Sequence, residues 1–150
     1  MTTLWMELPF GKYFGMTAPQ IVLRDPDWLY WANGNARPGP LSYQIGVVCD
    51  RARCIRLPLV DGVPQVVDYV VDRMSGKLAD VQVFPCPRAD SQGFSHVLDL
   101  SLARWYQHYD KCGSRMLVRA VKQYVLKVRR ITRELADDFF ADESNFAVCQ

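Results

Sequence analysis

The hydrophobic residues in the last third of the chain recur with a helical period. The periodic stretch begins at Ser114, a residue type that favours the helix N-cap, and continues to Leu135. At 100° per residue, with Arg115 at zero, the apolar side chains fall between about 160° and 300° on the helical wheel. These are Leu117, Val118, Val121, Tyr124, Val125, Val128, Ile131 and Leu135. The pattern predicts one long amphipathic helix over residues 114–135.

The middle of the chain has the composition of β-strands. Apolar and β-branched residues form four runs, which turn-forming sequences such as Asp61-Gly62 separate. The runs occupy residues 43–49, 54–60, 66–73 and 78–84. A further short run at 96–100 is a candidate fifth strand. We expect a mainly antiparallel sheet of four or five strands within residues 43–100.

The N-terminal segment carries strong signals for a turn and two short helices. Two glycines bracket Lys12 within residues 8–15, which suits a tight turn because glycine adopts positive φ without steric cost. The T-x-x-Q sequence at 17–20 is a capping box, so a helix is expected to start at residue 18. Asp-Pro at 25–26 predicts the start of a second helix, and Asn-Gly at 33–34 predicts its end.

Together these patterns predict an α+β fold. Short N-terminal helices and the long C-terminal amphipathic helix are expected to pack on one side of the antiparallel sheet. A chain of 150 residues with 49% hydrophobic content can bury a core as a single domain, residues 1–150. Its apolar runs fall short of the ~18–20 residues that a membrane span requires, and its N-terminus lacks a signal-peptide pattern. We expect a cytoplasmic protein whose five cysteines are reduced thiols.

The sequence PFGKYFGMTAPQIVLRDPDWLYWAN, residues 9–33, resembles a known module. It is similar to the C-terminal module of exodeoxyribonuclease X-like proteins, which combines an F-G-K-Y-x-G turn, a capped helix and a D-P-x-x-L-x-W helix. Phe14 stands where that module usually carries a lysine. The resemblance implies association with DNA-processing proteins as an accessory module, without the catalytic exonuclease core. It covers the motif at residues 9–34 and does not extend to residues 35–150.

The charge of the chain is segregated. The formal net charge is +2, yet residues 104–133 hold nine basic and one acidic side chain. Residues 134–150 hold five acidic and no basic side chains, so we distinguish an acidic tail at 136–150. Residues 1–103 are close to neutral, with nine basic and ten acidic side chains. The strongly basic block coincides with the predicted long helix.

Six cations occupy the polar face of that helix: Arg115, Arg119, Lys122, Arg129, Arg130 and Arg133. No acidic residue lies between the first and the last of them, although a merely solvated helix face normally mixes both signs. A helical stripe of this length spans about 27 Å, which matches several phosphates along a nucleic-acid backbone. The stripe therefore predicts noncatalytic nucleic-acid binding, and the resemblance at residues 9–33 implies DNA rather than RNA. Lys12 with Tyr13 on the glycine-flanked turn provides a second predicted contact.

The basic stripe is compatible with three alternatives to nucleic-acid binding. In the first, it is an ordinary solvated helix face, and in the second the acidic tail folds back over it and neutralises it. In the third, the protein is an adaptor or inhibitor whose basic face docks on an acidic protein partner.

Aromatic residues near the N-terminus are candidates for a further contact. Exposed aromatic residues beside a cationic groove hold single strands by base stacking. The candidates for that role are Trp28, Trp31, Tyr13 and Phe14. Aromatic side chains in short amphipathic helices are more often buried in the core than exposed for stacking.

The sequence offers little support for catalysis. Zinc binding requires closely spaced Cys and His residues, whereas Cys49 and Cys54 flank a predicted turn and suit a thiol pair. A nucleophile–base pair of Cys112 with His108 would lack an orienting partner. Four aspartates on predicted strands suggest a metal-dependent nuclease as a third hypothesis, but alternate solvent-facing aspartates are usual on a half-exposed sheet. They are Asp68, Asp72, Asp80 and Asp99. We expect no enzymatic activity, no metal and no cofactor.

Overall fold

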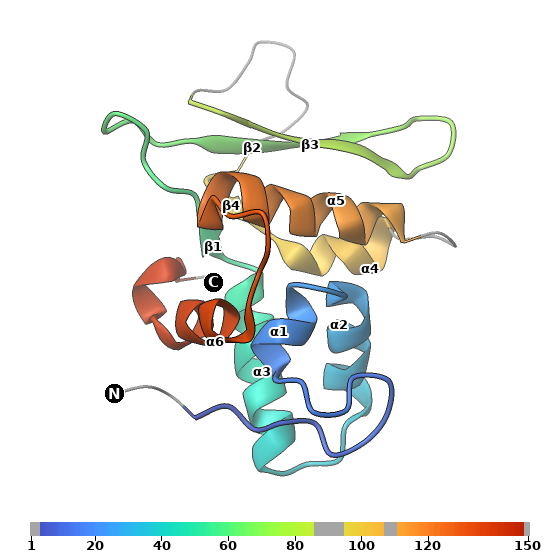
Figure 1. Ribbon diagram of the computed structural model, residues 1–150. Coiled ribbons are helices and arrows are strands. Elements are labelled where there is room, and N and C mark those ends of the chain that lie inside the picture. Colours follow the sequence, from blue (N-terminus) through green and yellow to red (C-terminus); the bar gives the residue numbers. More distant parts are fainter. Residues whose placement is uncertain (1–3, 86–94, 107–110, 149–150) are drawn as a thin grey trace.

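A computed structural model describes residues 4–85, 95–106 and 111–148. Within these ranges the fold is α+β, with six α-helices and two separate two-stranded antiparallel sheets. The hairpin of β2 (Val66–Val71) and β3 (Leu78–Phe84) lies along α5 (Cys112–Ala120) on one side of the molecule, and the short helix α4 (Ala103–Tyr106) packs against α5 (Figure 1). The remaining four helices form the other side (Figure 1). The α+β class is confirmed, but the predicted single sheet of four or five strands is wrong.

The two N-terminal helices begin where the capping signals place them. In α1 (Ala18–Val22) the backbone N–H of Thr17 donates to Gln20 Oε1 over 3.1 Å, as the capping box requires. In α2 (Pro26–Asn35) the carboxylate of Asp25 accepts from the Trp28 N–H. These signals act over three or four residues, so they do not depend on distant contacts.

The third helix, α3 (Pro40–Ala52), contradicts the strand predicted at residues 43–49. Proline at its first position suits a helix start, because the missing N–H would have no partner there. Its buried residues are Ile45, Val48, Cys49 and Ala52, at the i, i+3, i+4, i+7 spacing of a helix face. The β-branched composition of this run suggested a strand, and burial of its apolar face between α1 and α2 favours the helix.

Four strands form two short antiparallel pairs. In the first, β1 (Ile55–Arg56) pairs with β4 (Val97–Leu98). In the second, β2 (Val66–Val71) pairs with β3 (Leu78–Phe84) as a hairpin. The strand predicted at 54–60 is reduced to two residues. Pro58 lies just beyond it and cannot donate a ladder hydrogen bond.

The prediction of one long helix over residues 114–135 is also wrong. Helix α5 (Cys112–Ala120) continues into a π-helical turn (Val121–Leu126), and the chain then breaks at Lys127, which adopts a left-handed φ of 54°. A new helix, α6 (Arg133–Ala141), starts after Thr132, whose Oγ1 accepts from the Leu135 N–H. The apolar period runs unbroken through this region, so periodicity alone does not reveal the break.

The segment predicted as an acidic tail is part of the core. Ala136 and Phe140 of α6 are fully buried, and Phe140 stacks on Phe146 with ring centroids 5.2 Å apart. The main hydrophobic cluster extends from Trp5 to Phe146, so both ends of the described chain contribute to it. The last turns that the structure describes therefore stabilise the same core as the N-terminal helices.

Two sequence-based expectations concern thiols and membranes. Cys54 is disulfide-bonded and Cys49 is a free buried thiol, so they do not pair with each other and the expectation of five reduced cysteines is wrong. Burial raises the pKa of the Cys49 thiol to about 12.

None of the helices described is both long and apolar enough to cross a membrane.

Gly15 closes the predicted turn in a conformation that other residues adopt only with strain. Its φ is 82°, and its N–H donates to the Leu8 carbonyl over 2.9 Å. An added Cβ would meet no atom within 4 Å, so a substitution here tests backbone conformation alone.

We expect Gly15→Ala to lower the free energy of unfolding by about 1–2 kcal/mol in urea denaturation. As the matched control, Gly46→Ala within α3 should raise it by about 0.5–1 kcal/mol, because alanine favours a helix interior. Equal stability of Gly15→Ala and the wild type would contradict this account of the turn.

Candidate functional site

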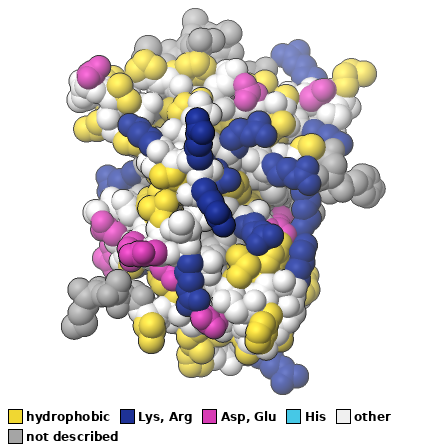
Figure 2. All heavy atoms as spheres, viewed as in Figure 1, with side chains coloured by type: hydrophobic (Ala, Val, Ile, Leu, Met, Phe, Trp, Pro, Cys, Tyr) yellow, Lys and Arg dark blue, Asp and Glu magenta, His cyan; other side chains and the backbone are white. Residues whose placement is uncertain are grey.

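Lys and Arg side chains gather over the middle of one face of the molecule (Figure 2). A hollow of about 550 Å³ has four cationic side chains in its lining: Arg24, Lys122, Arg130 and Arg133. We call it the basic hollow. Its remaining lining includes Gln20, Thr132 and Ile131, so polar and apolar groups accompany the cations.

The break after the π turn makes this surface concave. The Val128 N–H donates to the Lys122 carbonyl over 3.1 Å, so the chain turns back at Lys127 instead of continuing as a helix. Arg130 thereby lines the same hollow as Lys122, and Arg24, which follows the C-cap of α1, joins them. A straight helix would have left these cations in a convex row without Arg24.

Three of the four cations have no acidic partner within the described parts of the chain. Among the described residues, no acidic side chain forms an ion pair with Arg24, Lys122 or Arg130. The same holds for Arg119 and Arg129, which are exposed and lie close to Lys122 and Arg130 in the sequence. These five cations, which we call the unpaired cations, must be stabilised by solvent or by an anion from outside.

Arg133 differs from them because it is already paired. Its Nη1 donates to Glu7 Oε1 over 2.7 Å, and its Nε lies 3.6 Å from Asp137 Oδ2. The hydrogen bond to Glu7 is the main reason that the pKa of Arg133 is raised. This residue positions the start of α6 and is less available to a ligand than its neighbours.

The acidic residues of the C-terminal segment do not neutralise the unpaired cations. Asp137 contacts Arg133 and also accepts from the Thr17 hydroxyl over 2.6 Å, while Glu143 pairs with Arg51. Within residues 111–148, the acidic tail therefore does not fold back over the whole basic stripe, contrary to the second alternative. Arg115, at the start of α5, is exposed but is not part of the basic hollow.

Lys12 and Tyr13 belong to a different cluster, centred on the buried carboxylate of Asp25. The Tyr13 hydroxyl donates to Asp25 Oδ2 over 2.6 Å, and Lys111 Nζ donates to the same oxygen over 3.0 Å. Lys12 Nζ lies 3.9 Å from that oxygen and 5.3 Å from the centroid of the Tyr13 ring. Tyr13 is only 7% exposed. Its burial does not fit the predicted nucleic-acid contact, whereas the Lys12 side chain is largely exposed.

The cluster shifts the pKa values of its members in opposite directions. Burial by itself would raise the pKa of Asp25, but the hydrogen bonds from Tyr13, Lys111 and the Trp28 N–H outweigh it and lower this pKa. Burial and the hydrogen bond to Asp25 raise the pKa of Tyr13. Asp25 is thus held as a carboxylate that joins the N-terminal turn, α2 and the start of α5.

The aromatic candidates divide between core and surface. Trp28 is half-buried and packs edge-on against Tyr13, with ring centroids 5.0 Å apart. Trp31 and Phe14 are exposed, at 48% and 71%. Trp31 lines an apolar hollow of about 550 Å³ together with Phe10 and Leu41, separate from the basic hollow.

The strand aspartates do not assemble into a metal site. Asp72 accepts from the N–H groups of Met74 and Ser75 in the hairpin turn, and Asp99 accepts from Ser101. Among the residues that the structure describes, no group of three or more His, Cys, Asp or Glu side chains could hold a metal ion. His108 lies outside the described residues.

Arg24 is the cation of the basic hollow that no local sequence pattern indicates. It lies nearly 100 positions before Lys122, and no local pattern connects the two. Only the packing of α1 against α6 brings the end of α1 to this surface.

Comparisons with known proteins do not assign the chain to a family. No family model matches it, and no solved structure gives a significant match. Over 52 residues it is 40% identical to a protein described as "Acid phosphatase" from Mycobacterium tuberculosis (strain ATCC 25618 / H37Rv). The match covers 35% of this chain and 24% of that protein, so the chain spans about a quarter of its length.

Proposed function

We propose that this protein is a noncatalytic nucleic-acid-binding accessory protein that holds phosphate groups at the basic hollow. The observation that carries the proposal is the convergence of Arg24, Lys122 and Arg130 on one concave surface without acidic partners in the described chain. Arginine binds phosphate oxygens through its planar fork of donors, and lysine adds a mobile point charge.

The neighbouring unpaired cations extend this surface. Arg119 lies three positions before Lys122, on an adjacent part of the helix surface, and Arg129 precedes Arg130 in the segment that returns from the break. A flexible polyanion can contact both groups at once, whereas a small anion would occupy the hollow alone. We therefore favour a nucleic-acid strand as the ligand.

DNA is our preferred nucleic acid. The preference comes from the resemblance of residues 9–33 to the module found in exodeoxyribonuclease X-like proteins. Phosphate contacts do not read sequence, so we propose binding without sequence preference at the basic hollow itself.

We propose no phosphatase activity, despite the partial match to an acid phosphatase. Thr132 carries the only hydroxyl group in the described lining of the basic hollow, and its Oγ1 accepts from the Leu135 N–H. No histidine lies in that described lining to act as its base.

Binding of a fluorescent single strand and a fluorescent duplex across a salt series tests the proposal. If the five unpaired cations contact phosphates, log affinity should fall against log salt with a slope of about −3.5 for the single strand and about −4.5 for the duplex. A folded protein that binds neither at low salt would contradict the proposal. The basic surface would then fit an acidic protein partner, which pull-down experiments with Lys122→Glu as the negative control would identify.

A further inference from the structure

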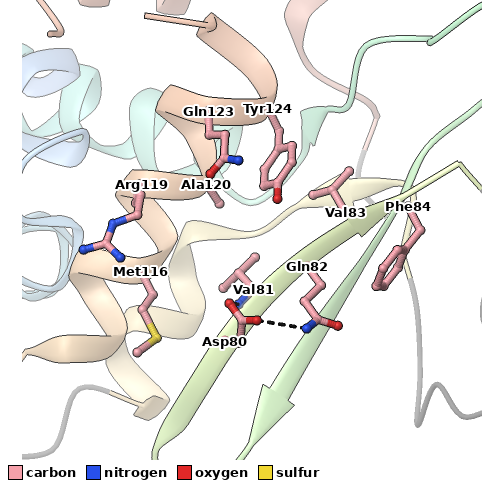
Figure 3. A pocket seen from close by; sticks show the side chains of 10 residues that line it. All are labelled: Asp80, Val81, Gln82, Val83, Phe84, Met116, Arg119, Ala120, Gln123 and Tyr124. Carbon is pink, nitrogen blue, oxygen red and sulfur yellow. Dashed lines mark hydrogen bonds between the residues drawn. The ribbon is translucent and has the colours of Figure 1, made fainter. Parts of the chain in front are cut away.

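A second hollow is lined by the same helical segment that contributes Lys122 to the basic hollow. It has a volume of about 380 Å³ and lies between β3 and residues 116–124. Figure 3 shows Asp80 and Gln82 projecting from β3, and Gln123 and Tyr124 projecting from the helical side. Arg119 belongs to its lining, so one of the unpaired cations stands at this second hollow.

The polar groups of this hollow have hydrogen-bonding capacity to spare. Gln82 Nε2 donates to Asp80 Oδ2 over 2.9 Å, and Asp80 Oδ1 accepts from the Val81 N–H. The carbonyl oxygen of Gln82 has no donor, and the amide of Gln123 makes no hydrogen bond, within the described part of the chain. Each carboxylate oxygen of Asp80 also retains a free lone pair.

Tyr124 adds an aromatic surface to these groups. Its ring is half-buried and points from the helical segment toward β3 (Figure 3). A nucleobase has the matching chemistry, because it combines a flat π-face with an edge of hydrogen-bond donors and acceptors. Bases in a duplex are already paired and stacked, so only an unpaired base would enter.

We propose that the hollow between β3 and α5 binds one unpaired nucleobase of a DNA single strand whose phosphates lie on Arg119 and the basic hollow. This inference rests on the proposed nucleic-acid binding. Asp80 accepts hydrogen bonds but donates none, so it selects bases that carry an exocyclic amino group. Cytosine offers such a donor at N4, whereas thymine presents a carbonyl oxygen at that position.

The test compares oligodeoxycytidine with oligothymidine of equal length at neutral pH and fixed salt. The wild type should bind oligodeoxycytidine about tenfold more tightly, the discrimination expected of one well-placed base contact. The double variant Asp80→Asn/Gln123→Ala should bind both strands about equally. Both positions are exposed, so the variant is expected to fold.

Asp50→Asn on the exposed face of α3 is the matched control, because it has the same net charge as the double variant. It should retain the preference for cytidine. Equal binding of both strands by the wild type, with the salt dependence intact, would overturn this inference and leave the proposed function standing. A preference that survives in the double variant but is lost in Trp31→Ala would assign the base to exposed Trp31 and also overturn it. Absence of salt-dependent binding would contradict the proposed function itself.

Discussion

Reversing two charges of the basic hollow, Lys122→Glu with Arg130→Glu, is expected to weaken DNA binding about 100-fold at ~50 mM salt. Release of counterions makes each phosphate contact worth about tenfold at that salt concentration, and the variant loses two contacts. The slope of log affinity against log salt should become less negative by about 1.4 for a single strand and about 1.8 for a duplex. Fluorescence anisotropy across the salt series measures both quantities.

The matched control is Arg37→Glu with Arg73→Glu. These two arginines are exposed and lie outside the basic hollow, in the segment between α2 and α3 and in the β2–β3 turn. Both double variants have the same net charge, so a general electrostatic effect would weaken binding equally in the two. Equal losses of affinity would show that the basic hollow is not the binding site.

Replacing Asp25 by asparagine is expected to lower the free energy of unfolding by about 3 kcal/mol at neutral pH. Asp25 is only 6% exposed, and its carboxylate accepts from Tyr13, Lys111 and the Trp28 N–H. Hydrogen bonds to a charged group contribute about 1.5–3 kcal/mol each, and the neutral amide leaves the Lys111 ammonium without its counter-charge. Urea denaturation measures the loss, with exposed Asp138→Asn on α6 as the control that should change little.

The pH dependence of this loss separates charge from packing. The pKa of Asp25 is lowered in the folded protein, so its stabilising contribution is complete above the unfolded-state pKa of about 3.9. It disappears as pH falls through the lower folded-state pKa, where the carboxylate becomes protonated. The difference in stability between the wild type and Asp25→Asn should therefore shrink as pH falls below about 4. A difference that stays constant down to about pH 2 would assign the loss to packing.

The Asp25 cluster gives the motif at residues 9–33 a structural role. Lys12 and Tyr13 of the F-G-K-Y-x-G turn meet the aspartate of the D-P helix, so two parts of the motif hold each other in place. The turn and the helix keep this geometry without any nucleic-acid contact by Tyr13. The functional surface that we propose lies instead on the segment that the resemblance does not cover, joined by Arg24.

The sequence by itself determined the features that depend on neighbouring residues. The capping box at residues 17–20 and the Asp-Pro start of α2 are stabilised within three or four positions, so both were predicted where the structure has them. The β2–β3 hairpin was also anticipated, because strand composition and an intervening turn sequence are local signals. The positive charge of residues 104–133 is likewise a property of the sequence alone.

Only the tertiary structure decided how these parts combine. The run at 43–49 is helical because α1 and α2 bury its apolar face, a contact that strand propensity does not register. The break at Lys127 is invisible to a periodic pattern, since both helices that flank it turn an apolar face to the same core. That break bends the cationic stripe into a hollow and lets Arg24 join it from the other end of the chain. Charge was encoded locally, but its concentration at one concave surface required long-range packing.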